Sequence, residues 1–501
     1  MKPDLAPSDA GLQAGYLTYP KDQLQTVLRI PGLGGDVTAL STLLGAPSPP
    51  VDQNPAWQAV NKQINANMRV LQVPQSDYMA RAATIMAGND LPDLFALTPN
   101  TLGIAQLPRF LRSSYADLTP YLAGDAIKDY PNLAAFPPSA WTQCVFDGAI
   151  LAVPNLRPEF QFTWFVNQSK LDAIGASHPR NGDEFKRLLK ELTRPQSNEY
   201  GIVELAPAYG LVYNGPGNVP MLAMFGTPNN WSVDSGGKFT KDIETEQFKA
   251  ALGFTRDLYA MGVYFPDPTM SITSEKIPFK GGNAAINANG WVTYLEFWND
   301  GIHQKPPVKF RVLDPISFDG SRPIRHRFNG VLGMTAIKNG RPERVKELLR
   351  IEDFLAAPFG SQESLLLEYG VKDVDFAFDV RGNPVKTTQG QSDTLVPWQF
   401  LALHPAVLYN ALDSDFARTA YAEEQAMVPL MVNDPSIGLY SPTAASKGGQ
   451  LTQKFADGLG EIVTARSPLS KLDQLLSDWK AGGGDQMRKE YEQLHAASQQ
   501  S

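Results

Sequence analysis

Hydrophobic positions in the first hundred residues follow two different periods. Three stretches are apolar and rich in branched or aromatic side chains, as strands are: 24–30, 69–75 and 91–98. The stretches 54–68 and 76–90 instead repeat their apolar residues at helical spacing, and the first opens with Asn-Pro, a helix-start signal. The segment 31–41, "PGLGGDVTALS", indicates a Gly-rich loop. The order strand, helix, strand, helix, strand predicts a parallel, doubly wound sheet.

The same alternation continues through the rest of the chain. Helices are predicted at 181–192, where Asn and acidic residues open the segment, at 245–263, and at 342–356, where Pro stands at the first helical position. The stretch "GVLGMTAIK" (330–338) predicts a strand, and the last third is helical. Two runs of strands and helices predict two α/β lobes.

The segment "FKGGNAAINANGWVTY" (279–294) combines small residues with two large aromatic ones. Small residues let a buried strand pack closely against its neighbours. We predict a strand that ends at Asn289-Gly290 and places Trp291 just beyond its end. Ligands of open α/β sheets bind beyond the carboxyl ends of the strands, so this pattern indicates an aromatic platform for a ligand.

Composition narrows the possible partners and compartments. The 501 residues are 43% hydrophobic and carry a net charge of −8 without a basic stripe, which argues against nucleic acid as the partner. We find no apolar run near 18 residues and no signal peptide. The polar, Pro-rich start predicts a flexible leader over 1–24, or a mature chain whose export signal has been removed. Cys144 is a nucleophile or an inert buried thiol, and we favour the inert alternative.

Familiar catalytic and metal-binding motifs are missing from the sequence. The five histidines lack metal-ligand spacing, and there is no Walker A loop or G-x-S-x-G elbow. "GLGGD" (32–36) lacks the full dinucleotide-binding pattern. We therefore expect no metal and no cofactor. A glycosidase stays open, because its two carboxylates need not be close in sequence.

Three tryptophans stand beside turn-forming residues instead of in periodic core runs. They are Trp231 in "TPNNWSVD", Trp291 in "NANGW" and Trp398 in "LVPWQF". An aromatic ring at a loop edge can stack on the apolar face of a sugar. For any one of them, packing in the core is the favoured explanation. Two of the three lining one cleft would indicate sugar binding.

Many short segments, in order, resemble the bacterial extracellular solute-binding proteins of the maltose-type cluster, which serve ABC importers. The chain is most similar to their lipoprotein-like, oligosaccharide-binding branch, over about residues 25–495. The segments that carry the resemblance include "GNDLPD" (88–93), "GAILAVPN" (148–155), "FGTPNNWSVDSGGKF" (225–239), "YAMGVYFPD" (259–267), "FKGGNAAINANGW" (279–291) and "DWKAGGGDQMRKEYEQL" (478–494). Several relatives have an acidic calcium-binding loop where this chain has "TRPQSNEYGI" (193–202), so we expect no calcium there.

The resemblance implies a two-lobed, periplasmic-binding-protein-like α/β fold of type II, with hinge strands and a ligand cleft between the lobes. By the family's layout, 25–155 and 328–395 form lobe 1, and 156–327 and 396–501 form lobe 2. The implied protein is an extracytoplasmic, monomeric, non-enzymatic component of an ABC transporter. It would capture an oligosaccharide, deliver it to the permease, and be held at the membrane by an N-terminal lipid anchor that this chain does not include.

The resemblance and the aromatic inventory together give a set of candidate ligand-binding residues. Stacking rings would come from the three tryptophans and from Tyr294, one helical turn past Trp291. Arg325 and Arg327 could hold the carboxylate of an acidic sugar, although salt bridging at a lobe edge is an equal alternative. The remaining candidates are Trp164, Asn89, Asp90 and Asn329.

Two other functions stay open. A polysaccharide hydrolase or lyase would use the same aromatic stacking but needs a positioned acid and base. A binder of a non-sugar solute, such as a peptide, is the weaker alternative.

Overall fold

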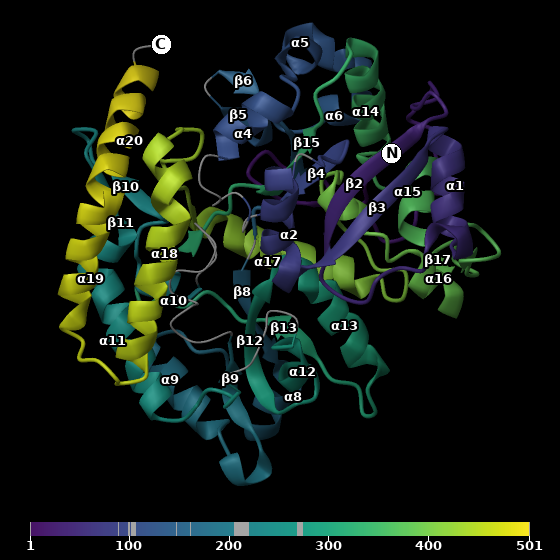
Figure 1. Ribbon diagram of the computed structural model, residues 1–501. Coiled ribbons are helices and arrows are strands. Elements are labelled where there is room, and N and C mark those ends of the chain that lie inside the picture. The colour runs from purple at the N-terminus through teal and green to yellow at the C-terminus, as the bar shows by residue number, and fades with distance from the viewer. Residues whose placement is uncertain are drawn as a thin grey trace. The chain divides into compact units, whose positions relative to one another are not determined.

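The computed structural model describes the chain except for residues 1, 89, 99–100, 102–106, 147, 161, 205–219, 268–273 and 500–501. The chain divides into two compact units, and most of their helices and strands are labelled in Figure 1. Unit 1 comprises Met1–Arg157 and Gly330–Tyr421, and unit 2 comprises Pro158–Asn329 and Ala422–Ser501.

The last boundary between the units differs from the expected one. Residues 396–421, which we expected in lobe 2, belong to unit 1. The reason is packing: Trp398, Phe400 and Leu401 are buried in the hydrophobic core of unit 1.

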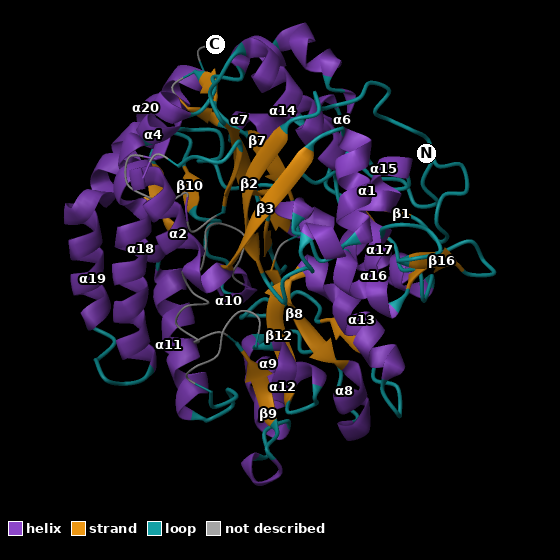
Figure 2. Ribbon diagram, turned by 45° about the vertical axis from the view of Figure 1, so that its right-hand side comes forward, coloured by secondary structure: helices purple, strands orange, loops and turns teal. Residues whose placement is uncertain are grey.

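The main sheet of unit 1 has the strand order β3-β2-β4-β15-β7. Strands β2 (Asp36–Leu43), β3 (Asn67–Pro74) and β4 (Leu94–Leu97) run parallel, whereas β15 (Val331–Ile337) is antiparallel to β4 and to β7 (Val153–Leu156). Figure 2 shows β2 and β3 side by side, with α1 nearby. Helices α1 (Pro55–Ile64) and α2 (Gln75–Gly88) are the two crossovers predicted from helical periodicity.

The first strand lies later than predicted. Residues 24–30 form no regular element, and β2 begins at Asp36, inside the segment 31–41 that we expected to be a Gly-rich loop. Leu28 and Ile30 are exposed, while the backbone N–H groups of Thr26 and Val27 donate to the Glu363 carboxylate. Burial explains the difference, because the apolar residues of β2 enter the core, whereas Leu24, Leu28 and Ile30 are exposed and only Val27 packs against it.

The N-terminal segment is ordered, unlike the flexible leader that we predicted. The short strand β1 (Ala14–Gly15) pairs in parallel with β18 (Val407–Leu408). Tyr19 is buried, and its ring contacts those of Phe359, Tyr369 and Tyr409. A cluster of aromatic rings that sequence periodicity does not reveal thus fixes this segment on unit 1.

The remaining elements of unit 1 surround its sheet and its N-terminal segment. The helices are α4 (Leu107–Ser114), α5 (Thr119–Leu122), α6 (Pro131–Ala134), α7 (Pro138–Thr142), α14 (Pro342–Leu355), α15 (Gln362–Tyr369) and α16 (Thr388–Asp393), and α17 (Asp415–Met427) continues into unit 2. Two hairpins complete it: β5 (Val145–Phe146) with β6 (Ala149–Ile150), and β16 (Phe376–Phe378) with β17 (Pro384–Lys386).

The main sheet of unit 2 has the order β13-β8-β12-β9. Strand β12 (Ala284–Gly290) lies between β8 (Phe162–Asn167), to which it is antiparallel, and β9 (Tyr200–Val203), to which it is parallel; β13 (Phe310–Val312) is at the edge. The small residues of β12 suit a central strand that is buried along most of its length. As predicted, the strand ends at Gly290 and Trp291 follows directly.

Two helices of unit 2 begin at residues whose side chains cap them, and Asn181 is the cap that the sequence indicated. Asn181 accepts a hydrogen bond from the Glu184 backbone at the start of α9, and Thr245 accepts one from Phe248 at the start of α11. The helices are α8 (Gln168–Ile174), α9 (Gly182–Glu191), α10 (Pro220–Met224), α11 (Glu246–Ala260), α12 (Lys276–Lys280), α13 (Tyr294–His303), α18 (Pro442–Val463), α19 (Lys471–Trp479) and α20 (Asp485–Ser498). The short ladders are β10 (Trp231–Val233) with β11 (Phe239–Lys241), and β14 (Arg325–His326) with β19 (Met431–Val432).

Close strand packing in unit 1 makes Gly333 a sensitive position. A Cβ atom there would lie 2.3 Å from the Leu97 carbonyl oxygen of the neighbouring strand β4. We expect Gly333→Ala to lower the free energy of unfolding by about 1–3 kcal/mol, the usual cost of overpacking. Urea denaturation followed by circular dichroism measures this.

Gly340→Ala is the matched control for that change, because its Cβ would meet only Arg344 side-chain atoms at 3.8 Å. We expect the control to stay within about 0.5 kcal/mol of the wild type. Equal losses in both variants would contradict the close approach of β15 and β4.

Candidate ligand-binding site

Two of the predicted stacking residues lie in hydrophobic cores. Trp231 in unit 2 is 3% exposed and packs against Phe239, Trp479 and Tyr491. Trp398 in unit 1 is 7% exposed. Both tryptophans are therefore packed in a core, as the favoured explanation for a single tryptophan held. Neither presents an open ring face on which a sugar could stack.

Trp291 and Tyr294 do lie together, but also in a packed environment. The ring centroids are 5.6 Å apart, and Trp291 lies at the same distance from Phe160. Trp291 is 3% exposed and Tyr294 is 1% exposed. The Tyr294 hydroxyl donates to a Glu423 carboxylate oxygen at 3.1 Å, and burial raises the pKa of Glu423 to about 7. The residue after β12 therefore anchors the start of α13 in the core.

The polar candidates lie in different surroundings. Asn89 falls outside the described residues, Asp90 is exposed, and Asn329 is half-buried. Arg327 forms an ion pair with Glu159 at 2.7 Å, which is the salt-bridge alternative considered for it. Arg325, two residues earlier, has a different environment.

Arg325 is a buried cation held by neutral groups. Its Nη1 donates to the Thr163 hydroxyl at 2.8 Å, and its Nη2 donates to the Phe162 carbonyl at 3.0 Å. Both acceptors belong to the first residues of β8, so the strand fixes the plane of the guanidinium. Burial lowers the pKa of Arg325 to about 10, which leaves it charged at neutral pH.

Trp164, in the middle of β8, is held by two contacts. Its ring stacks on Phe185, with centroids 4.7 Å apart and planes 21° apart. Its Nε1 donates to Glu204 at 3.0 Å, and burial raises the pKa of Glu204 to about 7. The indole is thus positioned from one face and from its polar edge.

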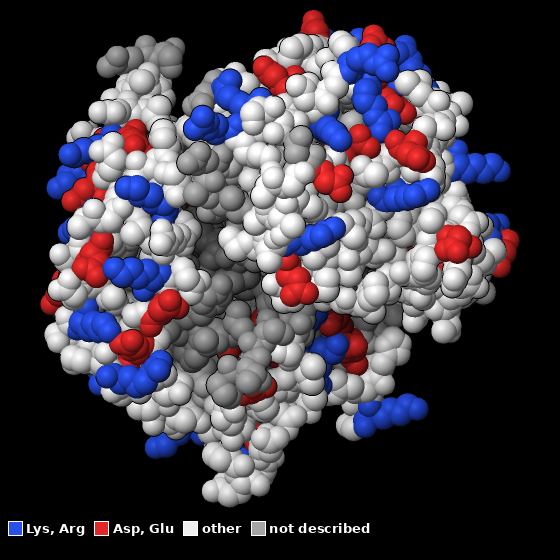
Figure 3. Space-filling view, viewed as in Figure 1, with Lys and Arg blue, Asp and Glu red and all other residues white. Residues whose placement is uncertain are grey.

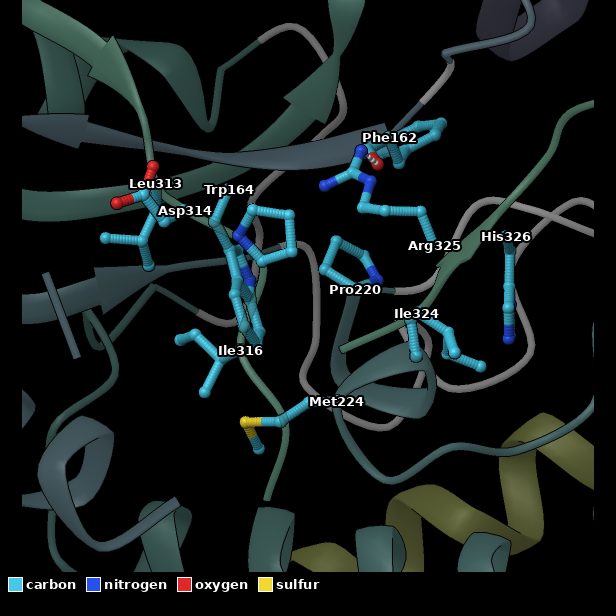
Figure 4. Close-up of a pocket in the computed structure, with 12 residues that line it drawn as sticks. Phe162, Trp164, Pro220, Met224, Leu313, Asp314, Ile316, Ile324, Arg325 and His326 are labelled. Atoms are coloured by element: carbon cyan, nitrogen blue, oxygen red, sulfur yellow. Dashed lines mark hydrogen bonds between the residues drawn. The ribbon is translucent and has the colours of Figure 1, made fainter. Parts of the chain in front are cut away.

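Trp164 and Arg325 line one small pocket in unit 2, whose cavity volume of about 20 Å³ is enough for about one water molecule. Figure 4 shows them from β8 and β14, with Pro220 and Met224 of α10 and Ile316 contributing apolar surface. The structure thus brings together two of the predicted site residues. Sequence inspection missed the apolar members of this pocket, because they come from short segments without periodicity.

His326 follows Arg325 on β14 and also lines the pocket. Its Nε2 lies 2.9 Å from the Thr227 carbonyl oxygen, and burial lowers the pKa of the imidazole to about 4. The ring is therefore neutral at neutral pH, and it adds no charge to the pocket.

The described residues were also searched for metal sites, membrane-spanning helices and a reactive thiol. Across the described ranges, no group of three or more His, Cys, Asp or Glu side chains is arranged to hold a metal ion, and no helix is long and apolar enough to cross a membrane. Cys144 is fully buried, and burial raises the pKa of its thiol, which supports the inert alternative. On the face shown in Figure 3, Lys and Arg side chains are interspersed with Asp and Glu.

Comparisons with known proteins agree with this architecture. The chain is 25% identical over 456 residues to the polygalacturonan/rhamnogalacturonan-binding protein YtcQ of Bacillus subtilis, covering 89% of this chain and 88% of that protein. It is 22% identical over 480 residues to lipoprotein LipO of the same organism, covering 92% and 93%. Among solved structures, alginate-binding protein AlgQ2 without calcium superposes with a TM-score of 0.68 at 13% identity, covering 92% and 98%. No protein-family model matches the chain.

These matches confirm the resemblance to the extracellular solute-binding proteins and the two-lobed α/β fold class that it implied. Both kinds of comparison extend over about nine-tenths of the chain, so the similarity includes both units. YtcQ and AlgQ2 are both named as binding proteins.

Proposed function

We propose that this chain is the extracytoplasmic solute-binding component of an ABC importer, which captures an oligosaccharide between its two units and delivers it to the permease. The observation that carries the proposal is the similarity to a polygalacturonan/rhamnogalacturonan-binding protein over 89% of the chain. A ligand that contacts both units favours the closed arrangement by its differential affinity for that state. Three passages of the chain between the units suit such a hinged closure.

The proposal includes the setting in which the protein works. The similarity to a lipoprotein over 92% of the chain supports an extracytoplasmic location at the cell surface or in the periplasm. We further propose that the protein acts as a monomer, is held at the membrane by an N-terminal lipid anchor, and does not transform its ligand.

The proposed ligand contacts are drawn from the predicted residues. Trp164 and Arg325 line one small pocket and stay proposals, although at 4% and 7% exposed they are as buried as the tryptophans of the cores. Asn89, Asp90 and Asn329 stay proposals for polar contacts to sugar hydroxyls. Buried Trp291 and Tyr294 would act by positioning the end of β12 instead of stacking on the sugar.

A thermal-shift screen of the full chain tests the proposal. The panel contains plant and microbial oligosaccharides, with peptides as the comparison class. We expect at least one oligosaccharide to raise the melting temperature in a saturable manner, since a ligand at one hundred times its Kd adds about 2.7 kcal/mol of stability.

Each other outcome supports a different function. If only peptides shift the melting temperature, the protein binds a non-sugar solute. Shortened or unsaturated products after incubation would identify a hydrolase or lyase. Monosaccharide components of the active sugar serve as the matched control for non-specific effects.

A further inference from the structure

Two of the three passages of the chain between the units run side by side in opposite directions. On the unit 1 side, the Arg157 N–H donates to the Gly330 carbonyl at 2.9 Å. On the unit 2 side, the Phe328 N–H donates to the Glu159 carbonyl, also at 2.9 Å. The unit boundaries, after Arg157 and after Asn329, fall between these two hydrogen bonds. The two passages therefore form one two-stranded crossing.

The backbone of this crossing is suited to bending at the boundary. Residues 157–160 and 327–330 belong to no helix or strand. Gly330 has φ +75°, in the left-handed region that glycine adopts without steric cost. A few residues at the ends of regular elements usually absorb the change of backbone angles in a hinge. What holds the crossing on each side of the boundary then decides how far the bend spreads.

Arg327, which the sequence suggested as a ligand contact, ties the crossing to the rest of unit 2. Its Nη1 binds the Glu159 carboxylate of the opposite strand at 2.7 Å. Its backbone N–H donates to the Val432 carbonyl at 3.0 Å, which extends the parallel pairing of β14 with β19. Strand β19 follows the third passage, which enters unit 2 at Ala422. One residue thus binds segments from all three passages.

Asn229, in the segment "TPNNW" (227–231), fastens the same segments through its side chain. Its Nδ2 donates to the Arg327 carbonyl at 2.8 Å and to the Val432 carbonyl at 2.9 Å. Both acceptors are carbonyl oxygens, so the amide nitrogen must face them. Asn229 is 1% exposed, and its Oδ1 has no hydrogen-bond partner among the described residues. The side chain is thus placed for the two carbonyls at the expense of its own oxygen.

We propose that Asn229 and Arg327 are positioning residues for ligand capture, which hold the unit 2 ends of the three passages as one rigid body and confine the bend of closure to the boundary near Gly330. This inference rests on the proposed function, and it assigns Arg327 to the hinge instead of to the ligand. Without the clamp, these ends would move in the free protein. Ligand binding would then include the entropic cost of ordering them, which lowers the apparent affinity.

Calorimetric titration of the full chain with trigalacturonate, the probe that the name of YtcQ suggests, tests the positioning role. We expect Asn229→Ala to weaken binding about tenfold, which corresponds to ordering one or two residues. Hydrogen exchange of the free variant should be faster at the amides of Arg327 and Phe328. If another oligosaccharide gives the largest shift in the thermal panel, it replaces trigalacturonate as the probe.

Thr255→Ala is the matched control for a general loss of stability in unit 2. Thr255 is 1% exposed, and its Oγ1 donates to the Ala251 carbonyl at 2.9 Å within helix α11. The variant therefore also loses a buried hydrogen bond from a side chain to a carbonyl, in a helix that none of the passages enters. We expect its affinity for the probe to equal that of the wild type, whatever the change in melting temperature.

A double-mutant cycle separates a hinge role of Arg327 from a ligand contact. Glu159→Gln should reproduce most of the affinity loss of Arg327→Gln, and the double variant should lose no more than the larger of the two, because the side chains act as a pair. Melting curves show whether each variant is folded at the titration temperature. If Asn229→Ala does not fold, this cycle decides the proposal alone.

The two levels of the proposal fail in different ways. If Asn229→Ala binds the probe as tightly as the wild type, or if Thr255→Ala loses as much affinity, the positioning role is overturned while oligosaccharide binding stands. Fully additive losses in the cycle would overturn the role of Arg327. If the wild type binds none of the sugars, in this titration or in the thermal-shift panel, the proposed function is contradicted, and the positioning role falls with it.

Discussion

We expect Trp291→Ala to lower the free energy of unfolding of unit 2 by about 3–5 kcal/mol, the usual cost of deleting a large buried aromatic side chain. The indole is 3% exposed and packs between Phe160 and Tyr294. Its removal leaves a cavity where β12 meets α13, and the surrounding backbone closes only part of it. Urea denaturation followed by far-UV circular dichroism measures the loss.

Val292→Ala provides the matched control at the next position. Val292 is 53% exposed, so its truncation should change stability by less than about 0.5 kcal/mol. A Trp291→Ala variant as stable as the wild type that no longer binds sugar would contradict the packing role. It would restore the stacking platform that the sequence suggested.

The second large effect concerns Glu352 on α14. Its side chain is 0% exposed, and neither carboxylate oxygen has a hydrogen-bond partner among the described residues. Burial raises the pKa of this carboxyl to about 8 from 4.5. The folded state therefore binds this proton more tightly than the unfolded state does. Its contribution to stability is full below about pH 4.5 and is lost as the pH rises through about 8.

Glu352→Gln removes this titration and keeps a similar shape. Between pH 5 and pH 9, we expect the stability of the variant relative to the wild type to rise by an amount on the order of 4 kcal/mol. Denaturant titrations across this pH range measure the difference. Glu343→Gln, an exposed position on the same helix, is the control and should follow the wild-type pH dependence. A Glu352→Gln curve parallel to the wild type would show that the carboxyl is solvated.

Local sequence signals predicted the elements whose stability is itself local. Helix α9 begins where Asn181 caps it, and α14 begins at Pro342, as the caps indicated. Strand β12 ends at Gly290, where the run of small residues stops. In each case the determinant is a hydrogen bond, a fixed backbone angle or close packing within one segment.

Long-range packing explains the elements that were predicted incorrectly. Residues 24–30 have the composition of a strand, yet β2 and not this segment forms part of the central sheet. The backbone N–H groups of Thr26 and Val27 instead donate to the carboxylate of Glu363, on a helix far away in sequence. Tyr19 is buried by rings from three other segments, which no pattern in the first 24 residues could reveal. The local preference of a segment for strand or loop does not determine its structure when residues more than 300 positions away in sequence provide its contacts.

The candidate site could be predicted only in part, because long-range packing also decides which of its side chains are buried. Turn-forming neighbours suggested that Trp231 and Trp398 lie at loop edges, but burial depends on what packs over the ring. Arg325 and Arg327 look equivalent in sequence, and only the structure separates the one paired with Glu159 from the one held by neutral acceptors. The sequence does not specify whether a carboxylate lies nearby in space, and this decides which of the two arginines forms an ion pair.

Calorimetry of the full chain with trigalacturonate, followed by chromatography of the recovered sugar, tests the central claim most directly. The account predicts saturable binding of one sugar per chain, with the trisaccharide recovered intact. Shortened or unsaturated products would contradict a solute-binding role. So would the absence of a binding signal for trigalacturonate and for every other oligosaccharide of the panel.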